Sequence, residues 1–296
     1  MGRAWLRQIS FVARTELSTG RQSRAVPLWG AAFSLAVVAG VWIAEAPDAA
    51  ISLGYLVGVD QGVDPVDPTA TVIFTLGRLF PLVLTFLAVG CCAGALAGER
   101  EAGTIRMLQS LPVSRSAVVC GKLLGRSALV SGIVVVGLAI GAAATWVRFG
   151  TISIVPYATF AGVSALFSMV LVTITLAVSA VVSTRLRSIA FSLGPLVLFL
   201  VFGSDHGVPV PFRTGLLYQP YQILVADTHD HLFAVPRFEW ALAADSDRSL
   251  ETLETTADLA ATAPAYLSEL GTVAALLAWA AVCLPIAVLA HRRHDL

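Results

Sequence analysis

Charged residues are scarce in this chain. They make up 13% of its 296 residues, whereas a soluble globular domain carries about 25%. Hydrophobic residues reach 57%, and the mean hydropathy is +0.81. These values exclude an ordinary soluble domain and indicate an integral membrane protein. The formal net charge is zero, so bulk charge gives no reason to expect a nucleic-acid partner.

Motifs for nucleotide binding and catalysis are also missing. The only lysine, Lys122, follows Gly121 but precedes Leu123, so the phosphate-binding motif Gly-x-x-x-x-Gly-Lys-Ser/Thr does not occur. The sequence lacks His-Glu-x-x-His, and no histidine falls inside a predicted membrane span. We therefore predict no catalytic residue, no metal site and no cofactor in this chain.

One histidine-rich segment needs a separate decision. It reads Asp227-Thr228-His229-Asp230-His231, and its side chains are of the kinds that bind divalent metals. Its spacing matches no defined metal site. A solvated polar loop is therefore the favoured interpretation, and metal binding by Asp227, His229, Asp230 and His231 stays an open alternative.

Six apolar stretches are long enough, or nearly so, to cross a bilayer. A helix needs about 20 apolar residues to cross about 30 Å of hydrocarbon. The stretches bounded by charges predict transmembrane helices at 26–44, 79–97, 127–147, 157–183, 188–203 and 270–290. None has a charged residue in its centre, which argues against a carrier that depends on buried carboxylates and against a voltage sensor. The energy for this protein's work should therefore enter from outside the membrane.

The basic residues predict the orientation of these helices. Fourteen of the 19 lie before the first span, between spans two and three, between four and five, or after the sixth. Only four acids lie on that side, namely Glu16, Glu99, Glu101 and Asp295. The basic excess marks the cytoplasmic face. We expect a multi-pass protein of the cell membrane with both termini in the cytoplasm.

Residues 3–24 predict an amphipathic helix before the first span. Apolar side chains recur at helical spacing among polar and charged ones, as in Trp5, Ile9, Val12, Glu16, Arg21 and Arg24. Such a helix is typical of the headgroup region of a membrane. A cytoplasmic helix packed on other protein is the alternative. Glycines at every fourth position, Gly90 and Gly94 among them, predict close packing of helices within the chain.

The segment 204–268 is expected to form a large external loop. It opens with Pro209 and Pro211, which a regular helix does not accommodate. An apolar stretch follows around Tyr218–Ala226. This order predicts either a re-entrant piece, whose backbone protein or water must cover, or a small external subdomain.

The most informative stretch is the connector between the second and third spans, residues 98–118. It begins with an acidic pair around Arg100, passes through Gly103 and a leucine-rich turn, and reaches Pro112 and Arg115. Both charge signs and an apolar centre are present, which is the usual composition of a protein–protein contact. Glycine allows a turn at Gly103, and proline ends a helix at Pro112.

Residues 98–126 resemble the same connector in permease subunits of exporter-type (type-2) ABC transporters. They are most similar to the branch that includes the permease of the nitrous-oxide-reductase maturation transporter. The shared pattern is an acidic pair, Gly103-Thr104, a leucine-rich turn, a Pro-x-Ser-Arg element at Pro112, and Gly121-Lys122. Six helices and a large loop between the fifth and sixth also match that family.

The resemblance implies an all-α integral membrane fold over residues 1–296, with residues 98–118 forming a coupling helix. A separate ATPase subunit binds ATP and Mg²⁺ and presses on this element, and a second permease copy or paralogue completes the transport path. The residues implied in docking are Glu99, Arg100, Glu101, Gly103, Thr104, Ile105, Arg106, Met107, Leu108, Leu111, Pro112 and Arg115.

Two other functions remain open from the sequence. A membrane assembly or anchoring protein would bind an external protein partner through 204–268 and would work without residues 98–115. An independent channel or carrier would show flux without ATP. The transported substrate, the direction of transport beyond the family resemblance, and the choice between homodimer and heterodimer do not follow from the sequence.

Overall fold

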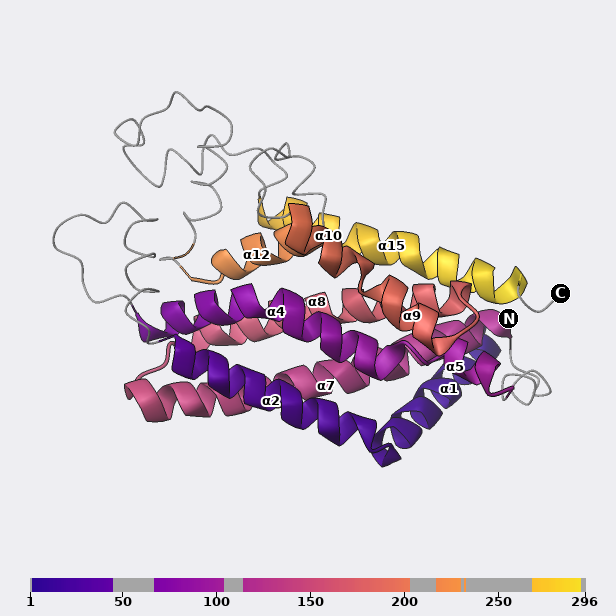
Figure 1. Ribbon diagram of the computed structural model, residues 1–296, viewed down its shortest axis with the longest axis horizontal. Coiled ribbons are helices and arrows are strands. Elements are labelled where there is room, and N and C mark those ends of the chain that lie inside the picture. The colour runs from indigo at the N-terminus through magenta and orange to yellow at the C-terminus, as the bar shows by residue number, and fades with distance from the viewer. Residues whose placement is uncertain are drawn as a thin grey trace, which may run out of the picture.

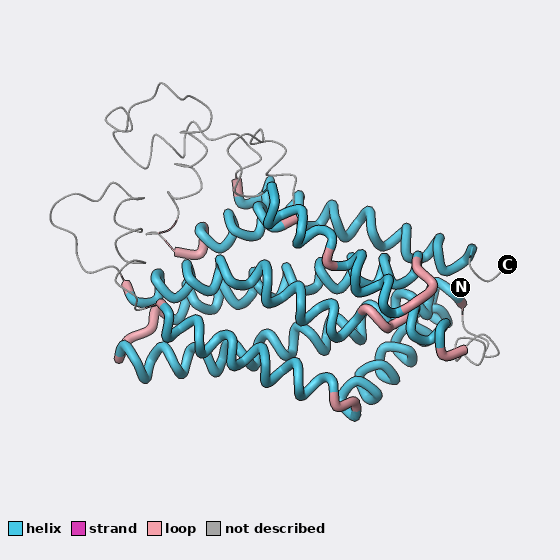
Figure 2. Tube along the Cα trace, viewed as in Figure 1, coloured by secondary structure: helices cyan, strands magenta, loops and turns pink. Residues whose placement is uncertain are grey.

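The computed structural model describes residues 2–44, 67–103, 114–202, 217–229, 232 and 268–293. Every regular element in these ranges is a helix, and most of the long helices run side by side, while the first one, residues 2–22, is inclined to them (Figures 1 and 2). The elements are α1 (Gly2–Gln22), α2 (Ala25–Ile43), α4 (Pro68–Cys92), α5 (Ala97–Glu101), α7 (Arg115–Phe149), α8 (Ile154–Val181), α9 (Arg185–Ser192), α10 (Gly194–Phe202), α12 (Tyr218–Ala226) and α15 (Glu269–Arg293).

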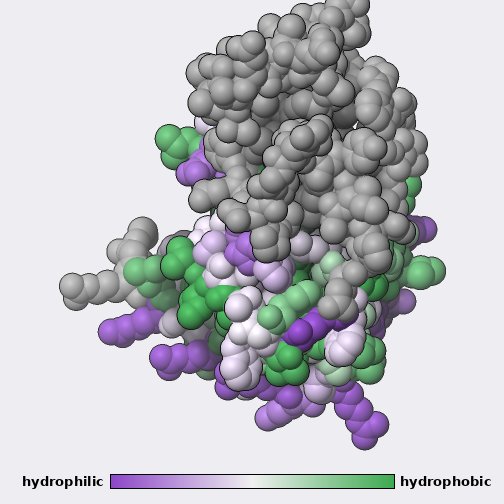
Figure 3. All heavy atoms as spheres, turned by 90° about the vertical axis from the view of Figure 1, so that its left-hand side faces the viewer, coloured by the Kyte–Doolittle hydropathy of each residue, from purple (hydrophilic) through white to green (hydrophobic). Residues whose placement is uncertain are grey.

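Five helical stretches in the described residues are long and apolar enough to cross a membrane. They are Ala25–Ile43, Pro68–Glu101, Arg115–Phe149, Ile154–Val181 and Glu269–His291. The all-α membrane fold predicted from the sequence is thus confirmed in outline. Many large hydrophobic side chains are exposed, as expected of a protein surrounded by lipid. Figure 3, a view onto one end of the bundle, shows exposed hydrophobic residues in green beside hydrophilic ones in purple.

The expected fifth span, 188–203, corresponds to two short helices instead of one continuous helix. Helix α9 ends at Ser192, and α10 begins at Gly194, one residue before Pro195. Proline fixes its own backbone and restricts the residue before it, which explains a break at this point. The six-span count therefore stays a prediction.

Capping residues, not charges, set where helices α4 and α7 begin. Helix α4 starts at Pro68, well before the expected 79, because the Asp67 carboxylate accepts a hydrogen bond from the Thr69 amide at 2.8 Å. Helix α7 starts at Arg115 instead of 127, and the hydroxyl of Ser114 accepts from the Ala117 amide. Both helices are consequently longer than a bilayer requires.

Helices α4 and α8 form the centre of the bundle, with α2 and α7 on one side. Aromatic rings fill this centre: Phe80 lies 5.6 Å from Phe33 and 5.4 Å from Phe160, measured between ring centroids. Glycines on α7 admit the side chains of α2. A Cβ atom at Gly137 would lie 2.5 Å from the Phe33 ring, so the predicted close packing at glycine is confirmed at this position.

Helix α12 is an apolar helix that packs against α4, α8 and α15. It lies within 204–268, the segment predicted to be external. Both of its tyrosines are buried, and their hydroxyls bond to the bundle: Tyr218 to Thr85 at 2.8 Å and Tyr221 to Ser164 at 3.2 Å. The ring of Tyr221 also stacks on Phe167. Most of the remainder of 204–268 lies outside the described residues.

Two glycine substitutions in α7 test how the packing at Gly137 affects the stability of the protein. Gly137→Ala places a methyl group against Phe33 and should cost about 1–3 kcal/mol through overpacking. Gly132→Ala meets nothing within 4 Å, so it should gain up to about 1 kcal/mol of helix propensity. Thermal unfolding in detergent micelles tests both. Equal melting temperatures for the two variants would contradict this account of the α2–α7 contact.

Candidate functional site

The connector begins as a short helix at one end of the bundle. Glu99, Arg100 and Glu101 lie on α5, and the chain then turns at Gly103, whose φ of +72° belongs to the left-handed region that favours glycine. The turn predicted at Gly103 is therefore present. Arg115 is the exposed first residue of α7. The other predicted docking residues lie outside the described part of the chain: Thr104, Ile105, Arg106, Met107, Leu108, Leu111 and Pro112.

A buried lysine joins the connector to two other helices. The Nζ atom of Lys122, on α7, donates to Glu16 of α1 at 2.5 Å and to Glu99 of α5 at 2.6 Å. Its side chain is only 1% exposed. Arg126, one turn further along α7, donates from Nε to the second Glu16 oxygen at 2.8 Å and from Nη1 to the Cys91 carbonyl. We call Glu16, Glu99, Lys122 and Arg126 the ion cluster.

Because the ion cluster is partly buried, its charges interact more strongly with one another than charges on the surface do. Burial by itself raises the pKa of the Glu16 carboxyl, but the adjacent Lys122 ammonium and Arg126 guanidinium outweigh it and hold that pKa below its ordinary value. Glu16 is therefore ionised at neutral pH. Removing one member of the ion cluster would leave an uncompensated charge in a partly buried position. This cost favours a cluster in which all four side chains stay together.

The next two residues of the connector are fixed to the opposite side of the bundle. Arg100 donates from Nη1 to the carbonyl oxygens of Ala180 at 2.7 Å and Val182 at 3.1 Å, where α8 ends. The Glu101 carboxylate accepts from the Arg185 amide at 2.9 Å, at the start of α9. Consecutive charged residues of α5 thus contact α7, α8 and α9, and Lys122 extends this attachment to α1.

A serine on α8 completes this attachment. The Ser179 hydroxyl accepts hydrogen bonds from the amides of Leu96 and Ala97 at 3.1 and 3.0 Å, and it donates to the Ala93 carbonyl at 2.9 Å. These backbone groups lie where α4 has ended and α5 begins, so a single buried side chain satisfies polar groups that no helix pairs internally.

Helix α1 uses its apolar residues to pack on α7. Ile9 and Val12 are buried, and a Cβ atom at Gly121 would lie 2.6 Å from Val12. Trp5 donates from Nε1 to the Ser116 hydroxyl at 3.3 Å. Ile9 and Val12 thus lie against protein within the same chain, whereas Trp5 is 39% exposed. Glu16 belongs to the ion cluster, and Arg21 and Arg24 are exposed. The interfacial position of α1 stays a prediction.

The length of helix α7 places the ion cluster near a boundary of the membrane. Helix α7 has 35 residues and measures about 52 Å, whereas the hydrocarbon is about 30 Å thick. Helix α2, with 19 residues, packs beside Gly137 and Gly141 of α7, while α1 packs beside Gly121 and Gly125. The first part of α7 therefore extends beyond the spanning segment, and its charges need not cross the hydrocarbon centre.

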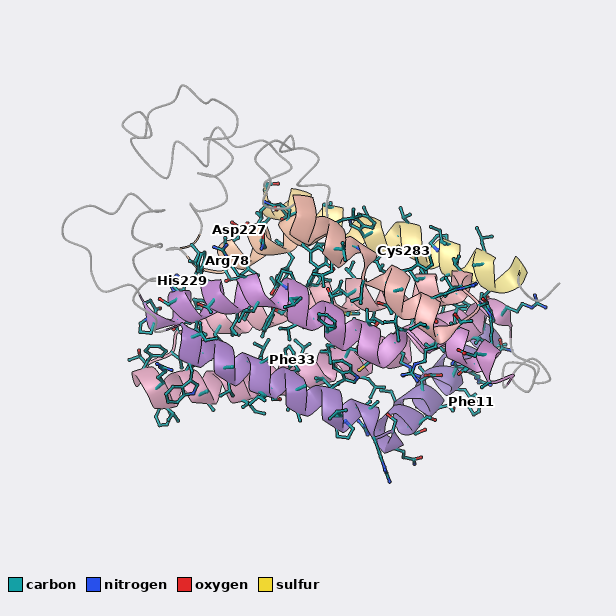
Figure 4. All side chains as sticks on the ribbon, in the orientation of Figure 1. Phe11, Phe33, Arg78, Asp227, His229 and Cys283 are labelled. Carbon is teal, nitrogen blue, oxygen red and sulfur yellow. The ribbon has the colours of Figure 1, made fainter. Side chains whose placement is uncertain are left out.

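A second polar cluster joins three segments at the opposite end of the bundle. Asp67, before α4, accepts from the Ser153 hydroxyl at 2.6 Å, and its Oδ2 lies 3.0 Å from Nε2 of His229. Burial alone would raise the pKa of Asp67, but hydrogen bonds from Ser153, His229 and Thr69 lower it to about 2. Asp227 and His229 lie at this end (Figure 4).

Two of the four residues in the metal alternative, Asp227 and His229, lie in the described part of the chain. Within the described residues, no group of three or more His, Cys, Asp or Glu side chains is arranged to hold a metal ion. Asp230 and His231 lie outside those residues. His229 instead links the segment after α12 to the start of α4, which gives α12 a fixed position.

Sequence reasoning identified the connector but missed the partners that fix it. In the sequence analysis, Lys122 appears as the only lysine and in the Gly121-Lys122 element of the connector pattern, without a partner. A usable signal was present: one lysine among the 19 basic residues, on a side with few acids, two of which are Glu16 and Glu99. The role of Ser179 carries no such signal, because it depends on the approach of α8 to α5.

Loss of the buried ammonium gives the sharpest test of the ion cluster. Lys122→Met keeps an unbranched side chain but leaves Glu16 and Glu99 facing each other, at an expected cost of about 3 kcal/mol. Arg187→Gln, at an exposed position on α9, should change stability by less than about 0.5 kcal/mol. Thermal unfolding in detergent compares the two variants. A Lys122→Met protein that melts with the wild type would show that the cluster contributes nothing.

A comparison with protein families agrees with this geometry. The model of the family described as "ABC-2 family transporter protein" matches residues 11–296. A search of curated proteins finds no significant match. Together with the apolar helices, the family match makes this chain a multi-pass membrane protein and a permease component of ABC transport, and not the catalytic component. The chain belongs to the ABC-2 family of transporter proteins.

Proposed function

We propose that this chain is the membrane-spanning subunit of an ATP-driven exporter. A separate ATPase subunit binds ATP and Mg²⁺ and docks on residues 98–115. Two permease subunits, identical or paralogous, form the transport path between them. Both termini and the connector face the cytoplasm. The similarity to the nitrous-oxide-reductase maturation branch remains a proposal that rests on residues 98–126 alone.

One observation supports this function above all: α5 is attached to four helices at once. Lys122 links it to α1 and α7, Arg100 links it to the end of α8, and Glu101 links it to the start of α9. Packed helices respond to a local push by moving as units, because their contacts have few intermediate arrangements. A force on the connector would therefore reach α1, α7, α8 and α9.

The cytoplasmic assignment rests on charge. The end of the bundle that holds α5 also holds α1, the start of α7, the start of α9 and the end of α15 (Figure 1). These segments carry most of the chain's basic residues, and basic residues accumulate on the cytoplasmic side of membrane proteins. An ATPase that uses cellular ATP would meet the connector on this side.

The anchoring function is the second candidate, and one structural feature favours it. Helix α12 is buried, its tyrosines bond to α4 and α8, and His229 contacts Asp67. One part of the segment 204–268 is therefore fixed to the bundle, as a docking platform for an external protein would require. That function would not depend on residues 98–115.

Purification from the producing cell distinguishes the two functions. Tagged full-length chain in mild detergent should carry ATPase activity, and Leu108→Arg should reduce the recovered activity at least tenfold, because a charge replaces an apolar side chain at the centre of the docking contact. Arg187→Gln is the matched control on the same side of the membrane and should keep the activity.

Two results would count against the proposal. A wild-type preparation without any nucleotide-hydrolysing protein would remove the motor that the exporter requires. Equal ATPase recovery with Leu108→Arg would remove the connector as its docking site. An external protein recovered equally with both variants, in the absence of ATPase, would establish the anchoring function instead.

A further inference from the structure

Three arginines form a single stripe along α1. Arg7, Arg14 and Arg21 are spaced by seven residues, and seven residues turn an α-helix by about 20° less than two full turns. The three side chains therefore lie within about 40° of one another. All three are exposed, and Arg24 is exposed just after the helix ends. We call these four residues the arginine face.

The arginine face points away from the rest of the protein. Ile9 and Val12, at 6% exposure each, lie on the opposite side of α1 and pack on α7. The nearby acid of α1, Glu16, is already paired with Lys122 and Arg126. None of the four arginines pairs with an acid within the described part of the chain. Four guanidinium groups are thus available to an outside partner.

The position of the stripe indicates what that partner is. Helix α1 ends at Gln22, and the spanning helix α2 begins at Ala25, so the two meet at an elbow (Figure 1). Arg21 and Arg24 lie within one turn of the first spanning residue. That is the depth of lipid headgroups, since the hydrocarbon begins where the apolar helix begins.

Exposed apolar side chains accompany the arginines. Phe11 is 62% exposed, on the outer side of α1 (Figure 4), and Leu28 is 69% exposed in the first turn of α2. Arginine beside exposed phenylalanine and leucine is the composition of helices that bind anionic membranes, with the cations on phosphate and the apolar groups among the acyl chains. An acidic protein surface would match the arginines but not the two apolar residues.

We infer that the elbow between α1 and α2 is a binding site for anionic phospholipid headgroups. Arg21 and Arg24 hold the phosphate, and Arg14 adds attraction from the next part of the stripe. Guanidinium groups bind phosphate oxygens in a bidentate manner, and this geometry favours arginine over lysine. Phe11 and Leu28 contact the acyl chains. This site does not depend on ATP, on the connector or on the proposed export function.

Lipid titration of the purified full-length chain tests this site. Native mass spectrometry counts phosphatidylglycerol and phosphatidylcholine, of matched acyl chains, on protein in detergent. The double variant Arg21→Gln/Arg24→Gln should weaken phosphatidylglycerol binding at least tenfold and leave phosphatidylcholine unchanged. The control Arg185→Gln/Arg187→Gln removes the same charge from exposed positions on α9 and should change the affinity less than twofold.

Further measurements distinguish binding of the lipid from binding of phosphate from other sources. Soluble glycerol phosphate at millimolar concentration should not compete with phosphatidylglycerol, because it lacks acyl chains. High salt should abolish the difference in phosphatidylglycerol affinity between the two double variants. Melting temperatures without lipid should match the wild type and so exclude misfolding. Equal losses in both double variants, or competition by glycerol phosphate, would overturn the inference. Unchanged lipid binding with loss of co-purified ATPase would assign the arginine face to a protein partner and overturn it as well.

Discussion

A buried ammonium group between two carboxylates holds the connector end of this protein together. Lys122 has almost no contact with solvent and binds Glu16 and Glu99 at once. These acids belong to helices that the chain places far apart in sequence, one before the first span and one after the second. Since a half-desolvated carboxylate without its cation is costly, α1, α5 and α7 are bound to one another as a unit. The remaining connector contacts, through Arg100, Glu101 and Ser179, extend that unit to α8 and α9.

In the proposed transporter, this constraint would let a permease without nucleotide-binding motifs respond to an ATPase subunit. At the start of the connector, residues 99–101 are attached to α7, α8 and α9 by charge-assisted hydrogen bonds. Such bonds are about twice as strong as neutral ones. A force on residues 99–101 would therefore also move the helices to which they are attached. At the opposite end, the contact between Asp67 and His229 fixes α12 against α4, so both ends of the bundle have defined polar attachments while the middle relies on packing between Phe33, Phe80 and Phe160.

Much of the membrane fold was predictable from the sequence, because apolar length and charge distribution depend on local composition. The bilayer requires long apolar helices, and the sequence shows where they are. The exact beginnings of α4 and α7 were not predicted, because the expected spans begin after the charged residues Arg78 and Arg126, whereas Asp67 and Ser114 act as the caps. Proline after Asp67 was a usable sign of a helix start. The break before α10 was also signalled, by Gly194 and Pro195.

The site was predictable only in part. The connector and its turn at Gly103 followed from motif and composition. Its attachments did not, because Glu16, Glu99 and Lys122 meet only through the tertiary packing of three helices, and no spacing in the sequence encodes that meeting. The burial of Tyr218 and Tyr221 was hidden for the same reason, since an apolar stretch after prolines fits either an external subdomain or a helix packed among spans.

Hydrogen–deuterium exchange on the permease–ATPase complex tests the central claim most directly. Backbone exchange is compared with and without a non-hydrolysable ATP analogue, in the wild type and in Lys122→Met. The account predicts that the nucleotide changes protection in residues 98–103, in α1 and in the first turns of α7 together, and that in the variant the change stays within residues 98–103. The same nucleotide-dependent change in α1 and α7 without the Lys122 ammonium would contradict it.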